Sequence, residues 1–148
     1  MAEGSVFPIA SALFNFTKGF TMARPRKDGL DYFPHDTNAS HDEKIMALRH
    51  LCGNDGYAFY FIILEMIFRG FSGNYTELDL KNKELKKVVV KSVGISFADF
   101  DYLVKMSLDI GLFDKKLFEK RQVLTSKRVK AVYTFINKQR KRQRKPLL

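Results

Sequence analysis

Apolar residues recur every three or four positions over much of the chain, which is the spacing of amphipathic helices. Ser40 followed by Glu43 forms a capping box, and this predicts a helix start near His41. Gly53 supplies a left-handed exit from that helix. Its expected apolar face consists of Ile45, Leu48, Leu51 and Cys52.

The segment from Gly56 to Arg69 is apolar almost all round, and Asn54 or Asp55 is placed to cap it. A helix without a polar face is typical of a buried central helix, and the glycine that follows ends it. The next segment, Phe71 to Leu80, is rich in turn-forming residues, and we expect a short strand around Tyr75.

Two further helices are expected in the middle of the chain. Lys83 to Val93 contains a run of three valines that also suits a strand, but Gly94 after it and a new N-cap at Ser96 favour a helix. The next helix, Phe97 to Ile110, is expected to end at Gly111 and to bury Phe100, Leu103, Val104 and Leu108.

A β-hairpin is expected after these helices. Leu112-Phe113 and Lys120 to Leu124 are strand-like, and Asp114-Lys115-Lys116 has the character of a turn. Thr125 or Ser126 then caps a final helix. That helix is expected to dock on the body through an apolar stripe of Val129, Val132, Tyr133 and Ile136.

This order of elements predicts a mainly α-helical, winged-helix fold: a helix-turn-helix with a short β-hairpin wing, an extra N-terminal helix and a long basic C-terminal helix. With 148 residues and 45% apolar content, the chain can build one core. We expect the winged-helix domain over residues 22–136 and a basic C-terminal tail, projecting into solvent, over residues 137–148. Residues 1–21 are expected to be a non-core extension, because Met22 opens a segment that looks like a natural start.

Cysteine usage and hydropathy restrict the setting of the protein. The single cysteine, Cys52, leaves no internal disulfide and no cysteine-based zinc cluster. The most apolar window, Tyr57 to Phe68, is shorter than the roughly twenty residues that span a bilayer. Glu3 stands where a signal peptide has a basic residue. We therefore expect a cytoplasmic protein of a bacterial or phage-infected cell, with no membrane partner.

Positive charge is concentrated at the C-terminal end. From Lys120 onward there are eleven Lys or Arg and no acid, whereas residues 1–119 hold fifteen bases against sixteen acids, so the net charge of +10 belongs to the end of the chain. This predicts a polyanion-binding surface there, and backbone binding without sequence preference, since the pattern implies no base-reading geometry. A solvated basic tail is the alternative. The candidate nucleic-acid-binding residues are Lys115, Lys116, Lys120, Arg121, Lys127, Arg128, Lys130, Lys138, Arg140, Lys141, Arg142, Arg144 and Lys145.

The second helix of the expected helix-turn-helix would normally enter the major groove of DNA. Its exposed side carries Asp99, Asp101 and Asp109 against Lys105 alone, and acids opposite phosphates are unfavourable. We expect this surface to contact protein instead, as self-association or docking of a basic partner, through Asp99, Asp101 and Tyr102.

Other chemistry has little support in the sequence. His35 and His41 lie near several carboxylates, but they are six residues apart across a loop, unlike the tight spacing of zinc ligands, and we expect no metal and no cofactor. The chain has no Gly-rich phosphate loop, no nucleophile elbow and no HExxH motif. We therefore expect no enzymatic activity.

Three segments carry a family resemblance: DYFPHD at 31–36, the stretch from Gly53 to Tyr60, and the pattern GLFD…LTS…R from Gly111 to Arg128. Over about residues 23–135 the chain resembles a domain of unknown function at the N-termini of phage and mobile-element proteins, often called replication-initiation or replisome-organiser proteins. That domain is similar to the N-terminal winged helix of the DnaD primosomal family. The resemblance implies a winged helix linked to replication or its control, with no established catalytic residue.

Together these expectations describe a non-enzymatic adaptor in phage or mobile-element replication. The basic C-terminal helix would bind DNA non-specifically, while the body would bind a replication protein or a second copy. The alternatives are a protein scaffold whose basic tail binds an acidic partner, and a winged-helix transcription regulator. The regulator would need sequence-specific binding, which the acidic helix disfavours.

Overall fold

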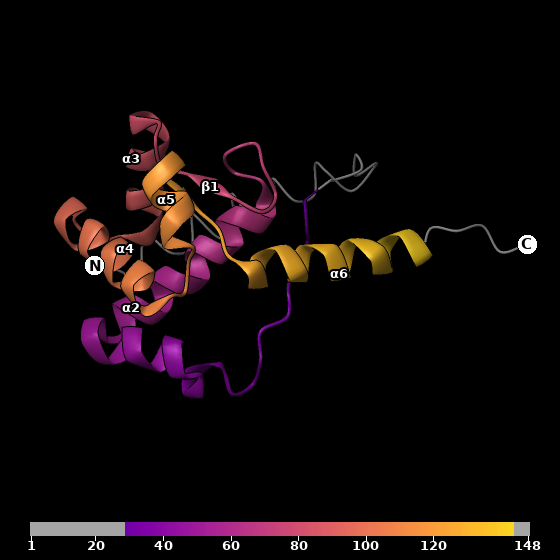
Figure 1. Ribbon diagram of the computed structural model, residues 1–148, viewed down its shortest axis with the longest axis horizontal. Coiled ribbons are helices and arrows are strands. Elements are labelled where there is room, and N and C mark those ends of the chain that lie inside the picture. The colour runs from indigo at the N-terminus through magenta and orange to yellow at the C-terminus, as the bar shows by residue number, and fades with distance from the viewer. Residues whose placement is uncertain (1–28, 144–148) are drawn as a thin grey trace, which may run out of the picture.

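Helices dominate residues 29–143, the part of the chain that this computed structural model describes (Figure 1). The elements are η1 (Ala39–His41), α2 (Glu43–Arg69), β1 (Leu78–Asp79), α3 (Lys83–Val93), α4 (Phe97–Ile110), α5 (Lys115–Arg121), β2 (Val123–Leu124) and α6 (Lys127–Gln143). The mainly helical class expected from the sequence is confirmed. The proposed extension over residues 1–21 and two candidate basic residues, Arg144 and Lys145, lie outside the described residues.

Helix α2 is the core of the fold and combines the first two expected helices. Gly53 has the positive φ expected of it (69°), and its backbone is not helical (ψ −161°), so α2 consists of two helical segments that meet at a kink, where the sequence predicts a boundary. The helix starts at Glu43, two residues after the expected His41, and the expected capping box at Ser40 is corrected: the carboxylate of Asp42 accepts the backbone N–H groups of Lys44 and Ile45 and so caps the helix. The residues before this cap form the 3₁₀ turn η1.

Length and composition alone would let α2 cross a membrane. The same apolar side chains pack inside the protein, where Phe59, Ile63, Met66 and Ile67 are almost completely buried. Helix α4 lies along α2, and α3 and β1 also contact it. We therefore interpret α2 as the buried central helix that the sequence predicts.

Helices α3 and α4 have the bounds expected from their capping residues. Ser96 caps α4 through the N–H of Asp99, and Gly94 and Gly111 take the left-handed conformation after α3 and α4. The expected buried face of α4 is confirmed. On α3, Val89 and Val90 are buried, whereas Val88 is exposed.

The expected hairpin over residues 112–124 is wrong. Residues 115–121 form helix α5, since the carboxylate of Asp114 accepts the N–H of Leu117 as an N-cap. Strand β2 follows α5 and pairs antiparallel with β1, with Leu124 opposite Leu78. The strand expected around Tyr75 is therefore found a few residues later, and its partner is not the segment Leu112-Phe113.

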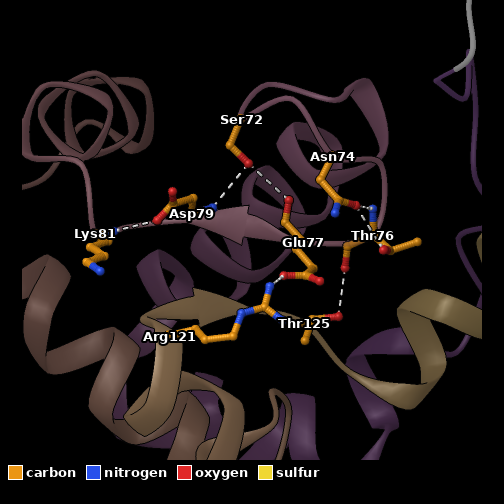
Figure 2. Close-up of polar contacts among 8 residues, drawn as sticks. All are labelled: Ser72, Asn74, Thr76, Glu77, Asp79, Lys81, Arg121 and Thr125. Carbon is orange, nitrogen blue, oxygen red and sulfur yellow. Dashed lines mark hydrogen bonds and ion pairs between the residues drawn. The ribbon is translucent and has the colours of Figure 1, made fainter.

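Side chains around this strand pair hold the chain between α2 and α3 in place (Figure 2). The hydroxyl of Ser72 donates to the carbonyl of Glu77 and accepts the N–H of Asp79, each over 3.1 Å. Thr125, directly after β2, is fully buried and donates to the carbonyl of Thr76 over 2.7 Å. These bonds fix the point from which α6 leaves the body.

Candidate nucleic-acid interface

Helix α6 projects from the body, and its C-terminal half extends beyond α2, α3, α4 and α5 (Figure 1). The backbone N–H of Val129 donates to the hydroxyl of Ser126, which confirms the expected cap at this end. The expected apolar stripe is also confirmed, because Val129 and Ile136 are each 2% exposed, and Val132 and Tyr133 are half-buried. The stripe fixes which side of α6 faces solvent.

Two of the candidate basic residues hold α6 on the body. The guanidinium of Arg128 lies 3.0 Å from a carboxylate oxygen of Asp36 and 3.8 Å from one of Asp42. Arg140 Nη1 donates to the carbonyl of Gly29 over 2.7 Å. In this arrangement both arginines contribute to the position of α6, and their charges are less available to a ligand.

An aromatic contact adds to this attachment. The rings of Tyr133 on α6 and Tyr75 in the loop before β1 are parallel within 6°, with centroids 6.1 Å apart. A Cβ at Gly70, which has φ 78°, would come within 2.3 Å of the Tyr75 ring, so only glycine fits at that position. The side of α6 that carries Tyr133 is therefore committed to the fold.

The opposite side of α6 carries five basic residues, with Ala131 and Thr134 between the first two and the last three, and we call it the α6 basic face: Lys127, Lys130, Lys138, Lys141 and Arg142. All five side chains are exposed. At about 100° per residue they fall within an arc of about 120°, opposite Val129 and Ile136. Within residues 29–143 none of the five makes an ion pair or a side-chain hydrogen bond.

The α6 basic face has the charge and length to follow a nucleic-acid strand. Helix α6 contains no acidic residue. Lys127 and Arg142 are fifteen positions apart, which at a rise of 1.5 Å is about 22 Å, or the rise of six to seven base pairs. Basic residues in the first turn of α6 oppose the helix dipole, so this end has a strong positive potential that an anion would relieve.

The candidate residues on α5 are divided between the surface and the fold. Lys116 and Lys120 are exposed, lie four positions apart on α5 and make no ion pair with any described residue. Arg121 pairs with the carboxylate of Glu77 beside the β1–β2 pair (Figure 2). Lys115 pairs with Asp109 over 3.0 Å, and this hydrogen bond raises the pKa of the lysine.

The three residues expected to contact protein lie on different sides of α4. Asp101 forms an ion pair with Lys86 over 2.9 Å, so part of the acidic surface is neutralised. Asp99 and Tyr102 are exposed and lie at the edge of α4 next to Cys52 and Asp55 of α2. There they line a pocket of about 230 Å³ with Cys52, Asp55, Ile95 and Leu103.

This pocket combines apolar walls with two carboxylates. In the described part of the chain neither Asp55 nor Asp99 has an ion-pair partner, and the Tyr102 side chain is 49% exposed. Burial raises the pKa of the Cys52 thiol, which keeps that wall uncharged. The pocket has the chemistry to accept a lysine or arginine side chain from a partner.

A larger cleft, about 670 Å³, lies where the N-terminal ends of α2, α5 and α6 meet. Its lysine and arginine side chains are balanced by acids, and the carboxylates of Asp42 and Asp114 already cap α2 and α5. Burial raises the pKa of Tyr60, which also lines the cleft, so its phenol stays protonated. This balance of charge makes the cleft a poorer anion site than the α6 basic face.

His35, which precedes α2, packs against aromatic side chains of that helix. The ring of His35 stacks on Phe61 with centroids 4.1 Å apart, and its Nε2 lies 3.0 Å from the hydroxyl of Tyr57. Over residues 29–143 no three His, Cys, Asp or Glu side chains are grouped to hold a metal ion.

Phe135 is the residue of this surface that the sequence analysis did not single out as a site. It is 60% exposed and lies at the edge of the α6 basic face, next to Arg142 on the helix surface. Helical spacing places Phe135 outside the apolar stripe formed by Val129 and Ile136, so its exposure could have been predicted from the sequence.

Comparison with known proteins places these features in a family. A family model described as Lin1244/Lin1753-like, N-terminal, matches residues 32–129. The "uncharacterized phage-related protein Lin1244/Lin1753" of Listeria innocua is 32% identical over 122 residues, which are 82% of this chain and 38% of that protein. The chain thus spans less than half the length of this relative, and no solved structure matches it. The expected kinship with phage-related N-terminal domains is confirmed, whereas the likeness to the DnaD family stays a prediction.

Proposed function

The chain belongs to the Lin1244/Lin1753-like, N-terminal family, and from that premise we propose that it is a non-enzymatic adaptor in phage or mobile-element replication. It acts in the cytoplasm of a bacterial or phage-infected cell. The α6 basic face binds DNA without sequence preference, while the body binds a protein partner or a second copy. The observation that carries the proposal is the α6 basic face, five exposed cations with no acid on the same helix.

Electrostatics favours backbone binding over base reading. Five cations that engage five phosphates release counterions, which gives a binding constant that falls with about the 4.5th power of salt on duplex DNA. Phosphate contacts of this kind position a protein without carrying sequence information. The attachment of α6 through Arg128, Tyr133 and Arg140 presents these charges on a rigid rod.

The pocket between α2 and α4 supports the protein-binding half of the proposal. Its two unpaired carboxylates, Asp55 and Asp99, flank the partly exposed ring of Tyr102. A basic side chain can pair with the carboxylates and lie over the ring. The partner surface is therefore positively charged.

We also propose that the architecture is a modified winged helix. The order α2, β1, α3, α4, β2 and the pairing of β1 with β2 support this assignment. Helix α5 then takes the place of the wing between α4 and β2. Because a helix replaces the hairpin, the basic residues of this region, Lys116 and Lys120, serve as a second, smaller contact with DNA.

A protein scaffold is the second candidate function, and the same observation favours it, because an acidic protein would also be attracted to the α6 basic face. A sequence-specific transcription regulator has less support. Its reading helix would be α4, whose exposed acids Asp99 and Asp109 would face the phosphates.

The test is a binding measurement on the full chain with several labelled duplexes of unrelated sequence. A variant with Gln at the five positions of the α6 basic face, which we call the face variant, should lose most of the affinity for every duplex. The matched control carries Gln at five exposed lysines of the body: Lys81, Lys83, Lys87, Lys91 and Lys105. Equal losses in the two variants would point to net charge alone, and a strong preference for one duplex would favour the regulator.

A further inference from the structure

Phe135 is an exposed aromatic ring on a helix that otherwise presents only polar, charged or small side chains to solvent. It is 60% exposed, although the next residue, Ile136, is 2% exposed. The ring makes no contact with another aromatic ring of the described residues. Ring contacts among residues 29–143 therefore give no reason for an aromatic residue at this position.

The surroundings of the ring are cationic. Lys138 and Arg142 follow Phe135 by three and seven positions, so helical spacing places them along the same line of the surface. Ala131, four positions earlier, leaves the approach to the ring open on the other side. A ligand that reaches Phe135 therefore meets an apolar ring with positive charge on its C-terminal side.

Single-stranded nucleic acid has this combination of chemistry. Its phosphates are anionic, and its bases offer flat apolar faces that stack on aromatic side chains. In duplex DNA those faces are already occupied by neighbouring bases, and opening a step has a free-energy cost. A ring on the surface of a single helix can thus add affinity for an unpaired strand but little for an intact duplex.

We propose that the α6 basic face is a binding site for single-stranded DNA or RNA, in which Phe135 stacks on a base while Lys138, Lys141 and Arg142 hold the adjoining phosphates. This inference rests on the proposed function and names the form of nucleic acid that the surface prefers. An acidic, apolar peptide is the competing ligand for the same chemistry, and the test separates the two.

The experiment measures the affinity of the full chain for a labelled mixed-sequence single strand and for the duplex of the same sequence. Phe135→Ala should weaken single-strand binding at least about five-fold, which corresponds to the loss of one stacked base, and should change duplex binding less than about two-fold. The matched control is Phe97→Ala, on α4, whose ring is similarly exposed (49%). It should change neither affinity.

A direct probe of stacking is available because the chain contains no Trp. Phe135→Trp should retain single-strand binding, and its fluorescence should be quenched by the single strand. Quenching that is absent, together with an unchanged affinity in Phe135→Ala, would overturn the stacking role and leave backbone binding intact. If neither the wild type nor any variant binds either nucleic acid at low salt, the proposed function itself fails and an acidic protein becomes the ligand to seek.

Discussion

Arg140 Nη1 and the carbonyl oxygen of Gly29 are 2.7 Å apart, in a hydrogen bond that joins residues 111 positions apart in sequence. The bond attaches the C-terminal half of α6 to the segment that leads into α2. It gives one of the basic residues in the C-terminal run a structural role, while its neighbours Lys138, Lys141 and Arg142 stay exposed. Basic residues close together in sequence therefore divide by the side of the helix on which they lie.

This division predicts different salt dependences for two neighbouring substitutions. Lys138→Ala should reduce the slope of log K against log salt by about 0.9 on duplex DNA, the contribution of one phosphate contact. Arg140→Ala should leave that slope unchanged, but it should speed amide hydrogen exchange over residues 137–143, because the end of α6 loses an anchor. An equal fall in slope for both variants would mean that Arg140 leaves Gly29 to bind DNA.

Ile136 and Phe135 are adjacent but should differ in their effect on stability. Ile136→Ala removes an almost completely buried side chain and should lower the free energy of unfolding by about 2–5 kcal/mol. Phe135→Ala removes an exposed ring and should change it by less than about 0.5 kcal/mol. Urea unfolding followed by circular dichroism measures both. A large loss for Phe135→Ala would show that its ring packs against the protein.

Thr125 joins β2 to the loop before β1. Thr125→Val keeps the shape but leaves the carbonyl of Thr76 without its hydroxyl donor, and should lower the free energy of unfolding by about 1–3 kcal/mol. Thr134→Val, at an exposed position of α6, is the matched control and should be nearly neutral. If the two variants are equally stable, the Thr125 hydroxyl contributes nothing to the β1–β2 connection.

Burial raises the pKa of the Cys52 thiol above its ordinary value of 9.0. The folded protein therefore holds this proton to a higher pH than the unfolded chain does. The contribution of the neutral Cys52 thiol to the free energy of unfolding is fully present below pH 9.0, and it is lost as pH rises through the folded-state pKa. Alkylation by iodoacetamide, followed by mass spectrometry across a pH series, should be slower in the native protein than in urea. Faster native alkylation at neutral pH would contradict this assignment.

Local signals in the sequence predict much of the helical part of the fold. The bounds of α3 and α4 follow from Ser96, Gly94 and Gly111, because a cap or a left-handed glycine acts within one turn of the chain. The prediction of a hairpin was wrong because it also rested on local signals. Asp114 can follow a strand or cap a helix, and contacts with distant parts of the chain determine which of the two forms. The partner of Leu124 is Leu78, far upstream, which no local pattern reveals.

The candidate site was predictable to a similar degree. The distribution of charge along the sequence located the basic surface on α6. Helical spacing separates the α6 basic face from the apolar stripe that contains Val129 and Ile136. The structural roles of Arg128 and Arg140 were not predictable, because their partners Asp36 and Gly29 lie 92 and 111 residues away. Long-range contacts decide which charges remain available to a ligand.

The central claim, that the α6 basic face binds nucleic-acid phosphates, is tested most directly by the salt dependence of binding. Fluorescence anisotropy of a random-sequence duplex and a single strand, titrated with the full chain over a salt series, gives the slope of log K against log salt. Five phosphate contacts predict about −4.5 for the duplex and about −3.5 for the single strand, and both slopes should collapse in the face variant. Slopes that the face variant leaves unchanged, or no binding at low salt, would contradict the account.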